Sequence, residues 1–368
     1  MDKTELALDS VELTVVVPTF NEAENIGLLV QKLDQALGGI RWEVIFVDDD
    51  SRDGTAEHVR RLAHADPRIR CLQRIGRRGL SSACIEGVLA SSAPYVAIMD
   101  ADLQHDEELL PRMLGALRTE PLDLVVGSRY IDGGGIGEWG KGRAKISSLA
   151  TRLSRLICKT EIADPMSGFF MFRREVFEHA IRRLSSQGFK ILLDLLASSP
   201  RPLRVKELGY EFRLRRHGES KLDTLVAWEF GMLIADKLIG HLIPVRFILF
   251  GMIGVLGLFV HLAVLGLSVR GLALTFTTAQ AGASIMAMTF NFFLNNILTY
   301  RDQRLKGARL LRGLLSFYLI CGIGVVANVG IANYVFTAHY TWWLAGIAGV
   351  VVGSVWNYAV SSIFTWKR

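Results

Sequence analysis

The last third of the chain is too apolar to belong to a soluble domain. Beyond Pro244, four long segments carry no Asp, Glu, Lys or Arg residue, at 247–268, 273–299, 314–336 and 342–364. A helix needs about 20 apolar residues to cross the hydrocarbon core of a bilayer, and each segment exceeds that length. Most charged side chains of the protein precede Pro244. The sequence therefore predicts a soluble domain at 1–222 and a domain of four transmembrane helices at 244–368.

Basic residues cluster beside these apolar segments. The connection after the second segment carries one acidic residue, Asp302, and five basic residues: Arg301, Arg304, Lys306, Arg309 and Arg312. By the positive-inside rule, this indicates a multi-pass membrane protein with both termini and the soluble domain in the cytoplasm. The N-terminal MDKTELALDS agrees, because it lacks the apolar stretch of a secretory signal. The net charge of +6 then suits lipid phosphate better than nucleic acid.

Two apolar stretches resemble each other and indicate an internal repeat. They read FNFFLNNILTYRD at 290–302 and WNYAVSSIFTWKR at 356–368. Each has an asparagine among aromatic residues, a threonine followed by an aromatic residue, and a basic end. This pattern predicts two similar helix pairs, with Asn291 and Asn357 in helix–helix contacts.

The segment 223–243 joins the two parts of the chain. It is apolar except for a stripe made by Glu229, Asp236 and Lys237, which helical spacing places on one side. This pattern predicts an amphipathic helix lying in the membrane interface. A core helix of the soluble domain is the alternative.

The soluble part alternates short apolar runs with helical patterns. The runs are expected to be strands at 13–17, 43–47, 69–73 and 95–99. Such alternation predicts a doubly wound α/β sheet, whose ligand crevice lies at the carboxyl ends of the strands. Pro18, Asp49 and Asp100 all follow such ends. We therefore expect them to meet at one site.

The stretch YVAIMDADLQH at 95–105 carries the strongest chemical signal. Asp100 and Asp102 emerge together where a buried strand reaches the surface, and Gln104 follows. Carboxylate and amide oxygens suit a hard divalent ion that keeps waters and bridges phosphates. The glycine-rich turn IGRRGLSSA at 75–83 matches neither GxxxxGK[ST] nor GxGxxG, which argues against P-loop NTPases and dinucleotide enzymes.

Six motifs in order resemble one known family. They read VVVPTFNEAENI, VDDDSRDGT, MDADLQH, VVGSRY, DPMSGFF and RHGESKL. This set is similar to the polyprenyl-phosphate sugar synthases of glycosyltransferase family 2, above all the dolichol-phosphate mannose synthases. That family implies a Rossmann-like GT-A catalytic domain. The membrane part resembles the four-helix GtrA family, whose members are proposed to help move polyprenyl-linked sugars across membranes.

The resemblance implies roles for particular residues. The nucleotide of the sugar donor would be held by Pro18, Phe20, Glu22, Val47 and Asp49. Phe20 stands where a tyrosine is frequent in the family. Mg²⁺ or Mn²⁺ would be bound by Asp100, Asp102 and Gln104, with Ala101 in the same donor-binding stretch. The acceptor phosphate or the donor diphosphate would meet Arg129, Arg143, Ser147, Arg215 and Lys221. Asp102, Arg129 and Arg143 would be central to catalysis.

The implied reaction transfers mannose from GDP-mannose to a polyprenyl phosphate, with inversion at the anomeric carbon. Two alternatives stay open: a polyprenyl-phosphate glycosyltransferase that uses a UDP sugar, and a non-enzymatic flippase or scaffold for lipid-linked sugars. A processive polysaccharide synthase is disfavoured, since no QxxRW motif occurs. The oligomeric state is left open.

Three further sets of residues are interpreted as structural. Asp194 falls near the position of a base in related enzymes, but we expect it to be structural or to position other groups. His105 is expected to be a polar loop residue. The four cysteines are far apart without paired spacing, which indicates reduced packing residues.

Overall fold

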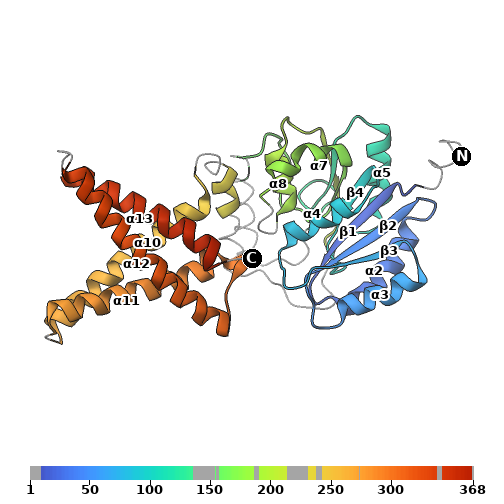
Figure 1. The fold of residues 1–368 in the computed structure, drawn as a ribbon. Helices are drawn as coiled ribbons and strands as arrows, with labels where there is room; N and C mark the ends of the chain where they lie inside the picture. Colours follow the sequence, from blue (N-terminus) through green and yellow to red (C-terminus); the bar gives the residue numbers. More distant parts are fainter. Residues whose placement is uncertain are drawn as a thin grey trace, which may run out of the picture. The chain divides into compact units, whose positions relative to one another are not determined.

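The computed structural model describes residues 10–135, 154, 157–185, 190–213, 231–237, 243–272, 274–337 and 342–366. The chain forms two compact units, Met1–Leu238 and Ile239–Arg368 (Figure 1). The change from one unit to the other thus falls inside the connecting segment predicted at 223–243.

The first unit is built on a seven-stranded mixed sheet of order β3-β2-β1-β4-β6-β5-β7. Its strands are β1 (Leu13–Thr19), β2 (Trp42–Asp48), β3 (Ile69–Gln73), β4 (Tyr95–Ile98), β5 (Leu124–Ser128), β6 (Phe170–Arg173) and β7 (Val205–Gly209). The four strands predicted from apolar runs are confirmed to within two residues. Strand β6 departs from the alternation, because it pairs antiparallel with both β4 and β5.

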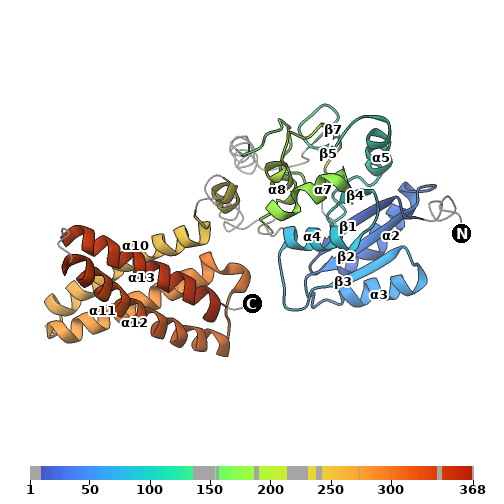
Figure 2. The same cartoon turned by 45° about the horizontal axis from the view of Figure 1, so that its top comes forward.

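Helices cover both faces of the sheet (Figures 1 and 2). One face carries α2 (Ala23–Ala36), α3 (Thr55–Ala65) and α5 (Leu109–Thr119), and the other carries α4 (Leu80–Ala90), α7 (Arg174–Ala180) and α8 (Ile191–Ser198). In β1, Val15 and Val17 pack with the first set and Val16 with the second. The strands therefore read as continuous apolar runs, as is typical of sheets buried on both sides.

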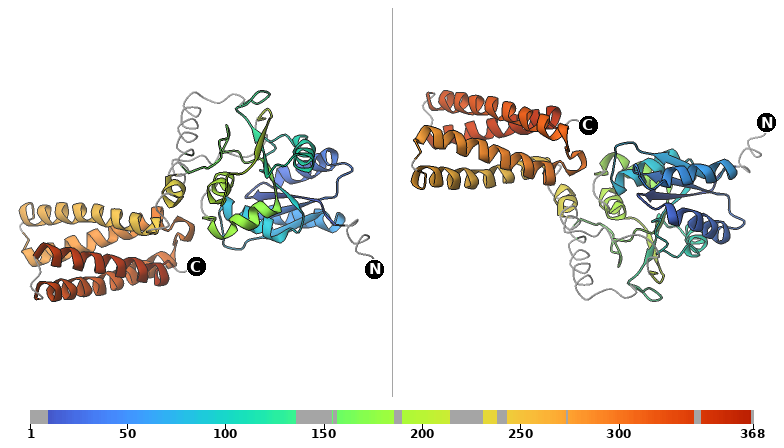
Figure 3. Two further views of the ribbon diagram at one scale, coloured as in Figure 1. Left: turned by 90° about the horizontal axis from the view of Figure 1, so that it is seen from above. Right: turned by 90° about the horizontal axis from the view of Figure 1, so that it is seen from below.

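The second unit consists mainly of four helices that lie side by side (Figure 3). They are α10 (Val245–Arg270), α11 (Phe276–Leu294), α12 (Ala308–Thr337) and α13 (Trp342–Phe364). Among the described residues, three stretches are long and apolar enough to cross a membrane: Val245–Arg270, Thr278–Thr299 and Ala308–Asn328. Helix α13 is also apolar over Val351–Phe364. The predicted segments match these helices, except that α12 begins earlier and takes in Arg309 and Arg312.

The internal repeat predicted from the sequence is visible in the helix contacts. A Cβ atom added to Gly257 of α10 would lie 2.2 Å from Oδ1 of Asn291, and one added to Gly324 of α12 would lie 2.1 Å from Oδ1 of Asn357. Each asparagine therefore packs against a glycine of the preceding helix, and the predicted helix–helix contacts are confirmed. Tyr300 and Trp366, which occupy matching places in the repeat, stack with ring centroids 4.2 Å apart.

Two glycines of the first unit differ sharply in their surroundings. A Cβ atom at Gly87 in α4 would lie 2.4 Å from Cγ1 of Val16 and 2.9 Å from Cγ2 of Val47, whereas one at Gly115 in α5 would meet nothing within 4 Å. We expect Gly87→Ala to destabilise the first unit by about 1–3 kcal/mol through overpacking. Gly115→Ala should stabilise it by up to about 1 kcal/mol through helix propensity. The thermal unfolding of both variants in detergent checks this, and equal melting shifts would contradict it.

Candidate active site

Three strand ends at one edge of the sheet share an unusual backbone conformation. Strands β1, β2 and β4 run parallel, and each is followed by a non-glycine residue with positive φ: Asn21 at 56°, Asp50 at 58° and Leu103 at 60°. Such left-handed conformations cost roughly 1 kcal/mol or more each and cluster at functional sites. The predicted ligand edge is thus also where the backbone is held under local strain.

Hydrogen bonds join the loops that follow β1 and β2. The Asn21 amide donates to Oγ of Ser51 at 2.9 Å, and the Glu22 amide donates to Oγ1 of Thr55 at 3.0 Å. In the sheet, Pro18 pairs with Val47. The structure therefore brings the predicted nucleotide residues Pro18, Phe20, Glu22, Val47 and Asp49 into one neighbourhood.

Asp49 is held by a buried arginine that the sequence analysis missed. Arg74 Nη1 lies 3.1 Å from Oδ1 of Asp49, and the Gly79 amide donates to Oδ2 at 2.7 Å. Burial raises the pKa of the Asp49 carboxyl, although the Gly79 amide and the Arg74 charge act in the opposite direction. The sequence signal was the place of Arg74, directly after β3 and before the glycine-rich turn. The Arg78 guanidinium also lies over the Phe20 ring, 4.1 Å from its centroid.

Asp100 and Asp102 lie in the loop that follows β4, and Ala101 between them is buried. Oδ1 of Asp102 accepts from the Gln104 amide at 3.2 Å, while the side-chain amide of Gln104 donates to the Arg213 carbonyl at 3.0 Å. The described residues contain no group of three His, Cys, Asp or Glu side chains that could enclose a metal ion. The carboxylates of Asp100 and Asp102 suit a metal ion that completes its coordination shell with water and phosphate oxygens.

The histidine of the same loop is more than the polar loop residue expected from the sequence. His105 is buried, its Nδ1 lies 2.7 Å from the Tyr210 hydroxyl, and its Nε2 lies 3.3 Å from Oδ2 of Asp100. Its ring also stacks on Phe169, with centroids 5.1 Å apart. The imidazole therefore orients Asp100. Its place beside the acid pair in MDADLQH was the signal for this role.

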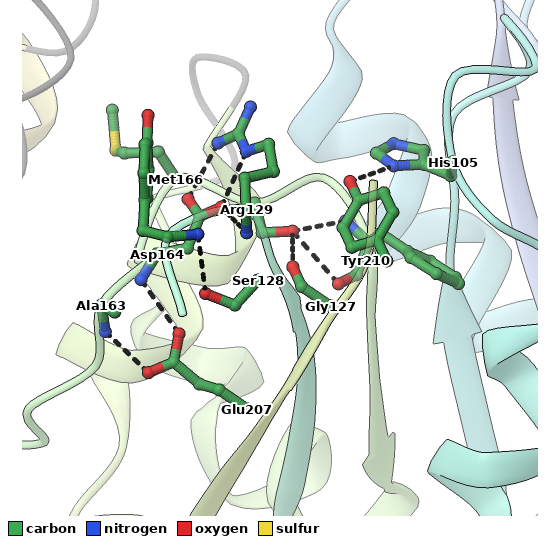
Figure 4. Close-up of polar contacts among 12 residues, drawn as sticks. His105, Gly127, Ser128, Arg129, Ala163, Asp164, Met166, Glu207 and Tyr210 are labelled. Carbon is green, nitrogen blue, oxygen red and sulfur yellow. Dashed lines mark hydrogen bonds and ion pairs between the residues drawn. The ribbon is translucent and has the colours of Figure 1, made fainter. Parts of the chain in front are cut away.

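Arg129, at the end of β5, is bound to a carboxylate of the protein itself (Figure 4). Its Nε and Nη2 donate to the two oxygens of Asp164 at 2.7 and 2.8 Å. Burial alone would lower the pKa of Arg129, but the bonds and charge of Asp164 outweigh it and raise this pKa. Glu207 of β7 in turn accepts from the backbone amides of Ala163 and Asp164 at 2.7 and 3.1 Å. The predicted phosphate-binding cation is thus present in a fixed orientation.

These groups surround a cavity of about 140 Å³. Its lining includes Asp100, His105, Arg129, Met166, Ser167, Gly168, Lys190 and Phe212. Gly168 approaches Asp100 closely, because a Cβ atom there would lie 2.8 Å from Oδ2 of Asp100. Arg129 and Lys190 form its basic wall, and Asp100 adds a carboxylate to the lining.

Lys190 belongs to the basic wall and was missed by the sequence analysis. It directly precedes α8, and its Nζ donates to the Met166 carbonyl at 3.3 Å. Burial and the nearby Arg129 charge lower the pKa of Lys190 to about 8. A lone lysine between the pair Gly188–Phe189 and the apolar run ILLDLL gives no sequence signal of its own, since its role depends on where α8 begins.

Comparison with known proteins identifies the family. The family model described as Glycosyl transferase family 2 matches residues 14–181, and that described as GtrA/DPMS, transmembrane domain matches residues 249–366. A dolichol-phosphate mannosyltransferase of Pyrococcus furiosus is 33% identical over 357 residues, which cover 96% of this chain and 99% of the relative. The chain belongs to the dolichol-phosphate mannosyltransferase family within glycosyltransferase family 2. It is therefore a glycosyltransferase with a transmembrane domain.

Other relatives show more limited likeness. A dolichol-phosphate mannosyltransferase of Saccharomyces cerevisiae is 39% identical over 230 residues, covering 60% of this chain and 85% of the relative. Among solved structures, glucosyl-3-phosphoglycerate synthase from Mycobacterium tuberculosis, in complex with Mn²⁺, UDP and glucosyl-3-phosphoglycerate, is 22% identical. It covers 64% of this chain and 81% of that chain, with a TM-score of 0.46.

Several predicted residues of this glycosyltransferase lie outside the described part of the chain: Arg143, Ser147, Arg215 and Lys221. Their roles stay predictions. Asp194, in contrast, is described and fully buried, and its carboxylate accepts from Ser185, Ser198 and Lys237. This supports the structural interpretation of Asp194.

The close approach of Gly168 to Asp100 predicts a metal phenotype. Gly168→Ala should displace the Asp100 carboxylate and lower the apparent affinity for Mg²⁺ about tenfold, the lower end for a lost supporting contact. Gly135→Ala is the matched control, because its added Cβ would meet only Cγ of Glu211, at 3.6 Å. Sugar transfer measured against metal concentration reads the effect, and an unchanged metal dependence would refute it.

The lowered pKa of Lys190 predicts an alkaline limb in the pH profile. The ammonium is protonated below its pKa of about 8 and loses its charge above it. We expect kcat/KM to fall as pH rises through this value. Nucleotide-sugar donors are anionic, and a neutral Lys190 would no longer attract them. In Lys190→Met, activity should be lower below pH 8 and this limb absent. A variant that kept the limb would assign it to another group.

Proposed function

We propose that the protein transfers mannose from GDP-mannose to a polyprenyl phosphate of dolichyl type, forming polyprenyl-phosphate mannose. One observation carries the proposal: Asp100, Arg129 and Lys190 line one cavity, in a chain with its own apolar helices. The cations suit phosphate groups, and the helices suit a lipid acceptor. The printed names of the relatives, dolichol-phosphate mannosyltransferases, agree with this choice of sugar and acceptor.

Asp100 and Asp102, with Gln104 beside them, would hold the Mg²⁺ or Mn²⁺ ion. When bound, the ion would neutralise the charge that grows on the departing nucleoside diphosphate. His105 would keep Asp100 in place for it, through the contact of Nε2 with Oδ2. The nucleotide itself would lie over the loops after β1 and β2, near Phe20 and Asp49. Asp102 also accepts a hydrogen bond from the Gln104 amide, within the stretch that would bind the sugar donor.

The acceptor needs little activation by the protein. A phosphate monoester is substantially ionised at neutral pH, since its second pKa lies near ~6. Its oxygen would attack the anomeric carbon as the bond to GDP breaks, which inverts the configuration in a single step. Arg129 presents a planar guanidinium held by Asp164, so it would orient phosphate oxygens without moving. Arg143, Ser147, Arg215 and Lys221 are further candidates from the sequence.

The reaction would take place on the cytoplasmic face of the membrane. The basic residues that support this are the ones around the end of α11 and the start of α12, namely Arg301, Arg304, Lys306, Arg309 and Arg312. Positively charged connections are retained on the cytoplasmic side. Polyprenyl phosphate with its headgroup at that surface would then be accessible to the catalytic unit.

The first experiment uses purified full-length protein in detergent with a short polyprenyl phosphate. Labelled GDP-mannose, UDP-glucose or UDP-galactose is supplied with and without Mg²⁺ or Mn²⁺, and label in the organic phase is counted. We expect metal-dependent label from GDP-mannose, and a loss of at least about 100-fold in Asp102→Asn, which removes charge stabilisation of the leaving group.

The control is Asp66→Asn, because Asp66 forms its ion pair with Arg68 on the surface, away from the cavity. Label from a UDP sugar alone would keep the reaction type and replace the donor. Absence of label from every donor would overturn the proposed transfer and favour a binding or flippase role.

A further inference from the structure

The end of the first unit contains a short helix that packs on the catalytic domain. Residues 231–237 are helical, and Leu233 and Ile234 are buried in a cluster with Leu193 of α8. Ile157, Cys158 and Met166 pack against the same cluster. In this part of the predicted interfacial segment, the apolar face therefore lies against protein, which is the arrangement that the alternative interpretation predicted.

A buried ion pair fixes Lys237, at the end of the described part of this helix. Lys237 Nζ lies 2.6 Å from Oδ1 of Asp194, and Asp194 has no exposed surface. The same ammonium donates to the Arg183 carbonyl and to Oγ of Ser198, both at 2.8 Å. All three ammonium protons thus have acceptors on the catalytic domain. The sequence placed Lys237 on a polar stripe, and the structure instead turns it inward.

The other side of Asp194 is equally complete. Its Oδ2 accepts from the amide and the hydroxyl of Ser185 at 2.9 and 2.8 Å, and its Oδ1 accepts from Ser198 at 3.1 Å. A buried carboxylate with these partners needs a cation to remain charged at low cost. Lys237 is that cation. A group so enclosed holds a neighbouring segment in place and is not built for proton transfer.

The docked helix and the cavity lie against different residues of α8. Met166 packs against the cluster that holds Leu233 and Ile234, and Met166 also lines the cavity. Lys190 and Ile191, at the start of α8, line it too, while Leu193 and Asp194 of the same helix face the 231–237 helix. One helix, α8, therefore carries both the cavity wall and the docking surface.

The chain leaves this docking surface on a short connection. Residues 238–244 separate Lys237 from Val245, where α10 begins. Seven residues span at most about 25 Å when fully extended. If residues 231–237 detached, the stretch of chain between the docking surface and α10 would lengthen by at least these seven residues. A longer tether lowers the effective concentration of one tethered partner at the other.

We propose that Lys237 and Asp194 form a clamp that keeps the catalytic unit on a short tether to the membrane helices and so allows it to use an acceptor held in a bilayer. The clamp rests on the proposed transfer to a polyprenyl phosphate. Lys237 is a positioning residue and touches no substrate. The clamp matters for acceptors confined to the membrane and little for acceptors that diffuse to the site.

The test compares two acceptors with GDP-mannose as donor. One is a long-chain polyprenyl phosphate in liposomes that also hold the full-length protein, and the other is a short, water-soluble prenyl phosphate. In Lys237→Met, kcat/KM for the liposome acceptor should fall about threefold, as expected when a seven-residue tether doubles in length, and stay unchanged for the soluble acceptor. The double variant Asp194→Asn/Lys237→Met removes both charges and should behave alike, without a stranded buried carboxylate.

Lys206→Met is the matched control, since it breaks an exposed lysine–carboxylate pair with Glu120. It should leave both acceptors unchanged. Parallel losses on both acceptors would overturn the clamp in favour of a general effect on folding, and no loss on either would overturn it as well.

A second measurement does not depend on activity. Amide hydrogen exchange of residues 231–237 should become at least about tenfold faster in Lys237→Met than in wild type or Lys206→Met, because the helix would open locally. Unchanged exchange would refute the clamp even if no sugar transfer were found. Wild-type protein that transfers to neither acceptor would instead overturn the proposed function.

Discussion

The bidentate ion pair between Arg129 and Asp164 connects the parts from which the site is made. Arg129 ends β5, and Asp164 belongs to the loop that leads into β6. Glu207 of β7 accepts hydrogen bonds from the backbone of that same loop. The Arg129–Asp164 pair and Glu207 therefore connect β5, β6 and β7. The loop then carries Gly168 to Asp100 and Met166 to Lys190. Without this pair, the loop that contacts both Asp100 and Lys190 would not be fixed to β5.

The polar edge of the sheet is held by buried partners rather than by solvent. Arg74 and the Gly79 amide hold Asp49, and His105 holds Asp100. Removing a buried ionic group's partner is strongly destabilising, so these supports fix the carboxylates in one geometry. The same logic recurs at Asp194, where the partner comes from the chain that leads to the membrane helices. The catalytic unit thus uses buried charge pairs to hold its loops and the 231–237 helix against the sheet and its helices.

The membrane unit depends on close contacts between small and polar residues. Asn291 and Asn357 each fill the space left by a glycine, and such contacts let helices approach closely in lipid, where burial of apolar surface gives no driving force between them. The repeat in the sequence foretold both contacts, because an asparagine at the same place in two apolar stretches needs the same kind of neighbour. The stacking of Tyr300 on Trp366 was not foretold, since it joins the two repeats to each other.

The sequence by itself determined what depends on neighbours along the chain. Apolar runs and their periodicity located the strands and membrane helices, and the residues directly after strand ends located Asp49 and Asp100. It could not determine pairs that are distant in sequence, such as Arg129 with Asp164 or Asp194 with Lys237. Those pairs depend on strand order and on the antiparallel path of β6, which local patterns do not encode. Only the tertiary structure decided them, because burial of a charge is set by everything that packs around it.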